Sequence, residues 1–265
     1  MVPLELPLGL GTSGLDDPAE CRATVTAALE AGYRHVDTAQ MYDNETAVGE
    51  GIAAAGVDRD DVVVATKIHP DNLAPVDVRE TAQESLGRLG LDRVDLLYVH
   101  WPMGAYDPDA TLPAFDALRE EGLTDHVGVS NFTPALLREA AEILDAPIAA
   151  HQVECHPRFQ QPELRGLAAE FDHQLVGYSP LARGDLFDDD EFKRVAERNG
   201  LSPAVLALAW ALARGVTPIP KATGDHVTEN RRAVGADVPK AALDAIDALE
   251  PGTRRIDPDD AAWNR

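Results

Sequence analysis

Cysteine is scarce in this chain of 265 residues: only Cys21 and Cys155 occur, far apart in the sequence. A disulfide framework and a paired-cysteine metal site are therefore not expected. No apolar run reaches 18 residues, and the first residues lack a basic stretch followed by a long apolar one. We accordingly expect neither a membrane span nor a signal peptide, and we place the protein in the cytoplasm, where thiols stay reduced.

Lysine is also scarce, with four residues, and 23 basic residues face 46 acidic ones, giving a formal net charge of −23. The acidic residues are scattered in short groups, so the whole surface repels nucleic acids and anionic membranes, and neither is an expected partner. In molar salt the Debye length is about 3 Å, which screens such self-repulsion. We hypothesise a halophilic source. This hypothesis predicts that the melting temperature of the protein falls in dilute buffer. An unchanged melting temperature there would contradict the hypothesis.

Short β-rich runs alternate with longer amphipathic stretches. Eight runs are expected to form strands, and several are nearly all apolar, as strands buried on both faces of a parallel sheet should be. They are Leu6–Gly11, His35–Ala39, Val62–Lys67, Val94–His100, Val127–Ser130, Ala149–Glu154, Leu175–Ser179 and Val216–Pro220.

Helix-start signals recur between these runs. Asp17-Pro18, Thr133-Pro134 and Ser202-Pro203 each place a capping residue before a proline in the first helical turn. The pattern predicts two helices between the last two strands and one more after the last strand. The expected helices are Pro18–Ala31, Asp77–Leu89, Thr111–Glu121, Pro134–Leu144, Asp188–Asn199, Pro203–Arg214 and Lys240–Leu249.

This order of elements predicts an α/β fold, a closed (β/α)8 TIM barrel. One such barrel takes about 250 residues, and no Pro/Gly-rich linker divides the chain, so we expect a single domain over residues 1–265. The glycine fingerprint of the open dinucleotide-binding sheet is absent, because Gly9-Leu10-Gly11-Thr12 lacks the third glycine.

Four polar residues lie where predicted strands end: Asp37, Tyr42, Lys67 and His100. Each alone is more often a loop cap or a rim residue, but four of them on three consecutive strands point to an active site, which (β/α)8 barrels build at these ends. A tyrosine has a pKa of about 10, and a nearby ammonium lowers it. Asp37 would hold Lys67 charged, and His100 would orient a substrate oxygen. Protonation of a carbonyl oxygen is predicted, with hydride from a nicotinamide cofactor, since no side chain supplies hydride.

Seven segments carry a recognisable pattern in order along the chain. They are Asp37-Thr-Ala-Gln-Met-Tyr42-Asp-Asn-Glu45, Thr66-Lys67, Leu97-Tyr-Val-His100-Trp-Pro102, Gly128-Val-Ser-Asn-Phe132, His151-Gln-Val-Glu-Cys-His-Pro157, Gly177-Tyr-Ser-Pro-Leu-Ala-Arg-Gly184 and Ile219-Pro-Lys-Ala222. They resemble the signature segments of the aldo-keto reductase superfamily over nearly the whole chain. The chain looks closest to the compact prokaryotic members of the diketogluconate-reductase type.

The resemblance implies that Asp37, Tyr42, Lys67 and His100 form the catalytic tetrad, with Tyr42 as general acid, and that Trp101 joins Tyr42 and His100 in contacting substrate. It further implies a set of residues around the cofactor. At the nicotinamide these are Ser130, Asn131, Gln152 and Tyr178, and at the ribose and pyrophosphate they are Gly11, Thr12, Ser179, Leu181 and Gly184. Without the resemblance, turn chemistry would explain Ser130 and Asn131, and ordinary core packing would explain Tyr178.

Toward the adenine end the resemblance implies Lys221, Glu229 and Asn230 as contacts. The NADP-preferring pattern has a hydroxyl residue after the lysine and an arginine three positions before the glutamate. Here Ala222 and His226 stand at these positions, and Thr223 can replace the lost hydroxyl. Histidine gives a weaker, pH-dependent contact than the planar fork of arginine. NADP(H) remains the expected cofactor, with NAD(H) as the alternative.

The resemblance also implies a small-molecule carbonyl substrate, and we expect a monomer. Two other functions stay open: a Schiff-base lyase that uses Lys67 as nucleophile, and a non-catalytic cofactor-binding regulator. No metal is expected, because His151, Cys155 and His156 would point in alternating directions along a strand and lack a fourth ligand.

Three expectations concern the ends of the chain and its histidines. The family's hairpin before the first strand is expected to be minimal here, since five residues precede Leu6. Trp263 could fold over the substrate site. His69, His126 and His173 are expected at the surface or in loops.

Overall fold

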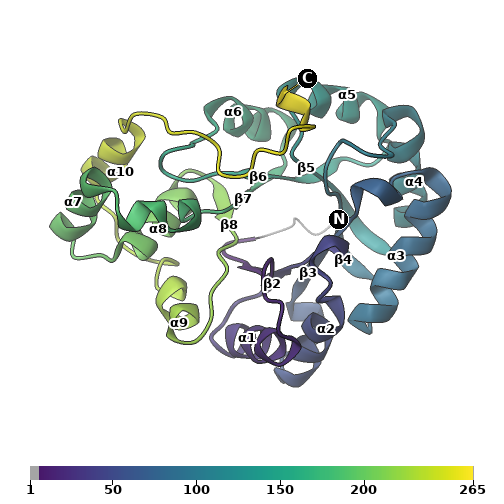
Figure 1. Ribbon diagram of the computed structural model, residues 1–265, viewed down its shortest axis with the longest axis horizontal. Helices are drawn as coiled ribbons and strands as arrows, with labels where there is room; N and C mark the ends of the chain where they lie inside the picture. Colours follow the sequence, from purple (N-terminus) through teal and green to yellow (C-terminus); the bar gives the residue numbers. More distant parts are fainter. Residues whose placement is uncertain (1–5, 265) are drawn as a thin grey trace.

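The computed structural model describes residues 6–264 and contains a curled eight-stranded parallel sheet whose strands neighbour one another in chain order. Helices surround the sheet on its outer side (Figure 1). The strands are β1 (Leu10–Gly11), β2 (His35–Asp37), β3 (Val63–Ile68), β4 (Val94–Val99), β5 (Thr124–Ser130), β6 (Ile148–Glu154), β7 (Gln174–Tyr178) and β8 (Val216–Pro218). Two backbone hydrogen bonds connect the chain around β1 with the chain around β8: Gly9 N, just before β1, donates to Pro218 O at 3.0 Å, and Gly11 N donates to Pro220 O, just after β8, at 3.1 Å.

All eight predicted strands occur, with shifted bounds. The first shortens to Leu10–Gly11 because only these two residues pair with β2, opposite Val36 and Asp37. The fifth starts earlier, since Thr124 already pairs with Val94 of β4. Within residues 6–264, no helix combines the length and apolar character needed to cross a bilayer. The predicted minimal N-terminal hairpin concerns residues 1–5, which lie outside the described residues.

The three helix starts predicted from a capping residue before a proline are confirmed, whereas α3, α4 and α7 start two or three residues away from their predicted positions. The Asp17 carboxylate accepts hydrogen bonds from Ala19 N and Glu20 N, both at 2.9 Å, and Thr133 and Ser202 cap their helices in the same way. The helices are α1 (Pro18–Glu30), α2 (Glu45–Ala54), α3 (Pro75–Leu89), α4 (Pro108–Glu120), α5 (Pro134–Ile143), α6 (Pro162–Phe171), α7 (Asp190–Arg198), α8 (Pro203–Ala213), α9 (Asp225–Arg231) and α10 (Lys240–Asp247). Short 3₁₀ turns are η1 (Gln40–Tyr42), η2 (Arg59–Asp61), η3 (Pro70–Asn72), η4 (Ala182–Phe187) and η5 (Ala262–Asn264).

The sequence predicts helices between the strands, but no residue ranges were predicted for α2, α6 and α9. In α2 two glycines weaken the helical signal, but tight packing requires them. A Cβ on Gly49 would lie 2.1 Å from Leu89 O, and a Cβ on Gly51 would lie 2.7 Å from the Val25 side chain. The glycines therefore allow α2 to pack closely against α3 and α1.

Apolar side chains also fill the space inside the curled sheet, where Ala65, Leu96, Tyr98, Ala150 and Val176 pack together. A larger apolar cluster lies between the sheet and the helices. Polar side chains are left for the carboxyl ends of the strands, where active sites of this fold class lie.

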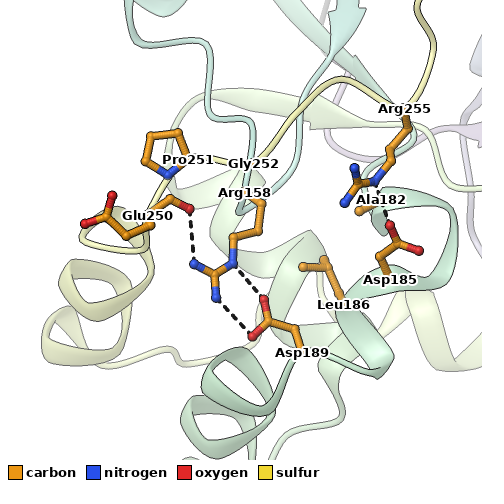
Figure 2. A pocket seen from close by; sticks show the side chains of 9 residues that line it. All are labelled: Arg158, Ala182, Asp185, Leu186, Asp189, Glu250, Pro251, Gly252 and Arg255. Carbon is orange, nitrogen blue, oxygen red and sulfur yellow. Dashed lines mark hydrogen bonds and ion pairs between the residues drawn. The ribbon is translucent and has the colours of Figure 1, made fainter.

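After α10 the chain returns toward the sheet and ends near α5 (Figure 1). Arg158 helps to hold this segment, because its Nη1 donates to Glu250 O at 3.1 Å and its O accepts from Gly252 N at 2.6 Å. Arg158 is itself fixed by an ion pair with Asp189 at 2.7 Å, and Arg255 pairs with Asp185 at 2.7 Å (Figure 2). The C-terminal segment is thereby tied to η4 and to the loop after β6.

His173 lies in the loop between α6 and β7, in agreement with its expected surface or loop position, but it is buried there. Its side chain is 7% exposed, because it packs on the Phe171 ring and on the ring of His151, whose centroid lies 6.0 Å away. Burial lowers the pKa of His151 to about 3 and that of His173 to about 4. Both imidazoles are therefore neutral in the folded protein at neutral pH.

This pair predicts acid-sensitive stability. The unfolded chain takes up protons on histidine near pH 6.5, and the folded chain does so only near pH 4 and below, so stability is complete above about pH 6.5 and falls as the pH drops. Each histidine contributes up to about 1.4 kcal/mol per pH unit in this window. Urea unfolding between pH 6.5 and 5 should show a shallower pH dependence for His173→Phe than for the wild type. Equal slopes would contradict the prediction.

Candidate active site

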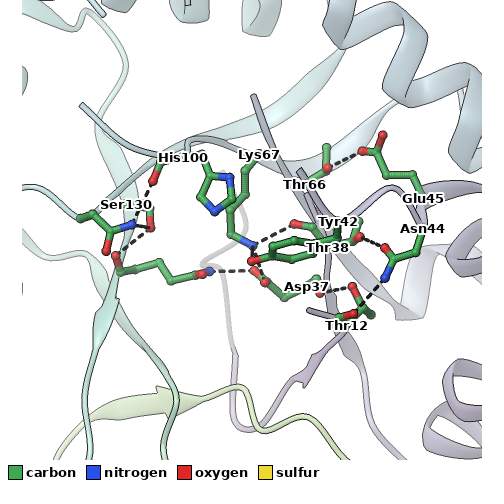
Figure 3. Close-up of polar contacts among 12 residues, drawn as sticks. Thr12, Asp37, Thr38, Tyr42, Asn44, Glu45, Thr66, Lys67, His100 and Ser130 are labelled. Atoms are coloured by element: carbon green, nitrogen blue, oxygen red, sulfur yellow. Dashed lines mark hydrogen bonds and ion pairs between the residues drawn. The ribbon is translucent and has the colours of Figure 1, made fainter. Parts of the chain in front are cut away.

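A buried ion pair joins β2 and β3. Asp37 is the last residue of β2 and lies opposite Ala65 in the parallel register, which brings Lys67 of β3 to the same end of the sheet. Lys67 Nζ lies 2.5 Å from Asp37 Oδ1 and donates to Thr38 O at 2.8 Å (Figure 3). Burial alone lowers the pKa of Lys67, but Asp37 and Tyr42 outweigh it and hold that pKa above its usual value. Lys67 is therefore an ammonium ion at neutral pH.

Tyr42 ends the turn η1 and reaches over this pair. Its hydroxyl oxygen lies 3.4 Å from Lys67 Nζ, and its ring stands edge-on to the ring of His100 with centroids 5.7 Å apart. We expected Lys67 to lower the pKa of Tyr42, and it does, but burial raises that pKa by more, so the net direction is upward. The predicted effect of Lys67 is confirmed, but it does not decide the net direction, because removing water from around the phenolate raises the pKa by more than the ammonium lowers it. Tyr42 is thus a neutral phenol next to the Lys67 ammonium ion.

Asn44 ties the Tyr42 turn to the loop after β1. Its Nδ2 donates to Thr12 O at 2.9 Å and to Leu15 O at 3.3 Å, and its Oδ1 accepts from the Thr38 hydroxyl at 2.9 Å (Figure 3). Thr12 is fully buried and donates its hydroxyl to Asp37 O at 3.0 Å. Sequence reasoning did not single out Asn44, although it stands two positions after Tyr42 in the quoted segment.

His100 follows β4 and faces Tyr42. Burial lowers the pKa of its imidazole well below the usual range, and the nearby Lys67 lowers it further. Its carbonyl oxygen accepts a hydrogen bond from Asn131 Nδ2 at 3.0 Å. His100 is accordingly a neutral ring, able to donate one hydrogen bond from whichever nitrogen carries the proton.

The residues expected around the nicotinamide form one hydrogen-bonded chain. The Tyr178 hydroxyl donates to Asn131 Oδ1 at 2.8 Å, and Asn131 Nδ2 donates to the Ser130 hydroxyl oxygen at 3.0 Å. Ser130 donates to Gln152 O at 3.0 Å, and Gln152 Nε2 donates to Asp37 Oδ2 at 2.7 Å. Gln152 therefore also supports the ion pair, a role that sequence reasoning did not assign.

These groups surround one cavity of about 640 Å³ at the carboxyl ends of the strands. It brings together most of the predicted site residues: Gly11, Asp37, Tyr42, His100, Trp101, Ser130, Asn131, Gln152, Tyr178, Ser179, Leu181, Gly184 and Lys221. Thr12 and Lys67 are buried beside it. The remaining predicted contacts lie beyond the cavity, in or before α9: Thr223, His226, Glu229 and Asn230. There the Glu229 carboxylate lies 3.3 Å from His226 Nδ1.

The cavity also contains residues that sequence reasoning missed. They are Ser13, Gly14, Met41, Pro180, Arg183, Phe187, Ile219, Pro220 and Ile256. Arg183 stands inside the quoted segment, so its position offered a signal. Ile256 lies in the C-terminal segment, where no pattern pointed to it. Trp263 lies against Trp101, with ring centroids 5.6 Å apart, but it does not itself line the cavity, so its expected position over the substrate site stays a prediction.

Two cations at the rim fit a phosphate-bearing ligand. Lys221 and Arg183 line the cavity, and neither has an ion-pair partner among the residues described. In a chain with 46 acidic residues, cations without carboxylate partners leave their positive charge available to an anion. A nicotinamide dinucleotide, with its charged pyrophosphate, matches such a rim.

The aldo/keto reductase family model matches residues 7–251 of this chain. An aldo-keto reductase of Mycobacterium avium is 38% identical over 254 residues, covering 93% of this chain and 87% of the relative. The methylglyoxal reductase DkgB of Salmonella typhi is 36% identical over 258 residues, covering 96% of each.

Solved structures give the same likeness. A crystal structure provisionally assigned to a 2,5-diketo-D-gluconic acid reductase B has a TM-score of 0.92 and 34% identity, covering 97% of this chain and 92% of that one. An aldo/keto reductase structure from Brucella melitensis has a TM-score of 0.84 and 35% identity, covering 91% and 93%.

Proposed function

The chain belongs to the aldo/keto reductase family, and from this premise we propose that it reduces aldehydes and ketones to alcohols with a nicotinamide cofactor. The observation that carries the proposal is the convergence of Tyr42 and His100, which line the cavity, with Lys67, which is buried beside it. A neutral phenol, an adjacent ammonium and a neutral imidazole are the groups that protonation of a carbonyl oxygen requires.

When bound, the reduced nicotinamide supplies the hydride that attacks the carbonyl carbon. Tyr42 transfers its proton to the carbonyl oxygen, which becomes the alcohol hydroxyl. Lys67 stabilises the phenolate that remains. Asp37, whose Oδ1 lies 2.5 Å from Lys67 Nζ, keeps Lys67 in its charged form. His100 donates a hydrogen bond to the same oxygen and orients the substrate. Trp101 forms the apolar side of the substrate position.

We propose that residues of the chain contact each part of the cofactor. We assign the carboxamide to Ser130, Asn131 and Gln152, and the nicotinamide ring to the face of Tyr178. The ribose and pyrophosphate are assigned to the backbone of Gly11 and Thr12 and to the loop with Ser179, Leu181 and Gly184. Lys221, with Thr223 and His226, would contact the 2′-phosphate, and Glu229 and Asn230 the adenine. We therefore propose NADP(H) as the preferred cofactor over NAD(H).

A panel of carbonyl compounds tests both parts of the proposal. It should include methylglyoxal and 2,5-diketo-D-gluconate, the compounds named for the relatives, with NADPH and NADH in molar KCl. Turnover of at least one carbonyl with a higher kcat/KM for NADPH is expected, and Lys221→Met should lower kcat/KM for NADPH about tenfold, the effect of losing one charge-assisted contact. Faster turnover with NADH would overturn the NADP(H) assignment.

The two other functions are not favoured by any observation. A Schiff-base lysine must be a neutral amine, whereas Asp37 holds Lys67 as an ammonium. Turnover of a simple aldehyde would exclude a purely regulatory role. We further propose that residues 1–265 form one closed barrel and act as a cytoplasmic monomer. The two backbone bonds between the chain around β1 and the chain around β8 support closure.

A further inference from the structure

Glu154, the last residue of β6, is a buried carboxylate that the proposed reaction does not use. It is 0% exposed. Its Oε1 accepts from Arg255 N at 2.8 Å and lies 3.0 Å from His156 Nε2, and its Oε2 accepts from Ile256 N at 3.0 Å. Burial alone raises the pKa of Glu154, but the hydrogen bonds from His156 and the two backbone amides outweigh it and hold that pKa below its usual value. Glu154 is thus a charged anchor with three donors.

The two anchored residues and Arg254 before them form what we name the C-terminal strap, residues 254–256. No helix or strand contains them, since α10 ends at Asp247 and η5 begins at Ala262. Two successive N–H groups on one carboxylate therefore set the position of the strap backbone. Glu154 lies opposite Tyr178 in the parallel register of β6 and β7, so the strap passes over the carboxyl ends of these two strands.

Each residue of the strap contacts a different part of the site. Ile256 lines the cavity together with Trp101 and Tyr178. Arg255 pairs with Asp185 of η4 (Figure 2). The guanidinium carbon of Arg254 lies 3.7 Å from the ring centroid of Trp263, which in turn packs on Trp101. Displacing the strap would move one wall of the cavity and would loosen the packing of the Trp263 ring on Trp101.

We infer that Glu154 is a positioning residue for substrate specificity: it holds the strap so that Ile256 forms a wall of the substrate end of the cavity. The inference rests on the proposed carbonyl reduction. Glu154 acts only through Ile256 and touches none of the reacting atoms. Its removal should therefore alter the binding of substrates large enough to reach Ile256, and it should leave proton transfer from Tyr42 unchanged.

The first variant is Glu154→Gln, assayed with methylglyoxal as the small probe and 4-nitrobenzaldehyde as the large one. The amide keeps the size of the side chain but presents one acceptor oxygen, so at least one anchoring bond is lost. Loss of one hydrogen bond to a charged group changes an equilibrium constant about tenfold. We expect about a tenfold drop in kcat/KM for the aromatic aldehyde, mainly through KM, and less than about a twofold change for methylglyoxal and for cofactor Kd.

Hydrogen exchange provides a readout independent of activity. The amides of Arg255 and Ile256 should be protected in the wild type and should exchange faster in Glu154→Gln. Asp116→Asn is the matched control, because Asp116 also accepts from two successive amides, Asp145 N and Ala146 N, both at 2.9 Å. Asp116 does not line the cavity. This control should lose protection at its own two amides without changing KM for either aldehyde.

Ile256→Ala keeps the inference testable if Glu154→Gln fails to fold. Truncation of the wall should change the ratio of kcat/KM between the two aldehydes, and an unchanged ratio would overturn the inference. So would Glu154→Gln with faster amide exchange but normal KM values, or with unchanged exchange. If the wild type reduced no carbonyl compound at all, the proposed function would fail instead, and the exchange data would still report whether Glu154 anchors the strap.

Discussion

Tyr42→Phe is expected to reduce the rate of carbonyl reduction about a thousandfold while cofactor affinity changes little, since a positioned general acid contributes about 10²- to 10⁴-fold. The substitution removes only the hydroxyl that lies 3.4 Å from Lys67 Nζ. The ring remains to pack edge-on to His100. The measurements are kcat/KM for methylglyoxal and cofactor Kd from fluorescence titration.

Tyr106→Phe is the control for this prediction. Tyr106 is another phenol whose hydroxyl has no hydrogen-bond partner within residues 6–264, and its ring packs on Phe132 away from the cavity. Removing that hydroxyl should leave kcat/KM unchanged. Near-normal turnover by Tyr42→Phe would show that another group protonates the substrate.

Lys67→Met should destabilise the fold and also impair reduction. Asp37 is 1% exposed, so loss of the ammonium leaves a buried carboxylate with Gln152 as its remaining side-chain donor. Breaking a buried ion pair from one side costs about 3–5 kcal/mol. Reduction should fall as well, because the phenolate formed at Tyr42 loses its neighbouring cation. The measurements are the free energy of unfolding in urea and kcat/KM.

A double variant separates the pair from its surroundings. Asp37→Asn combined with Lys67→Met removes both charges, so the free energy of unfolding should recover part of the loss caused by Lys67→Met alone. Activity should stay low, since the cation beside Tyr42 is still missing. Strictly additive losses of stability would mean that the two residues do not depend on each other in the folded protein.

Local chemistry made the fold predictable. The apolar runs and the cap residues Asp17, Thr133 and Ser202 act over a few neighbouring positions, so the eight strands and several helix starts could be inferred before the structure was known. Helix α2 escaped prediction because its glycines serve contacts with residues distant in sequence, Leu89 above all.

The candidate site followed from the same logic, with the family resemblance supplying the roles. In a parallel sheet the carboxyl ends of neighbouring strands meet at one edge, so Asp37, Lys67 and His100 had to come together once their strands were placed. The α9 residues lie outside the cavity, and Ile256 lines it from a segment without any pattern. The family resemblance identified site residues by their type and their place in a motif, whereas the shape of the cavity depends on how segments distant in sequence pack together.

The sequence by itself determined the periodicity of the strands, the helix starts and the set of polar residues at the strand ends, because these depend on residues close together in the chain. Only the tertiary structure decided how much water each group loses. That loss of water raises the pKa of Tyr42 despite the nearby Lys67, and it keeps the His173 imidazole neutral. It also makes the charge of Glu154 costly, and hydrogen bonds from the amides of residues about a hundred positions away offset that cost. Burial is a property of the whole packed chain, which is why no short pattern could reveal these three outcomes.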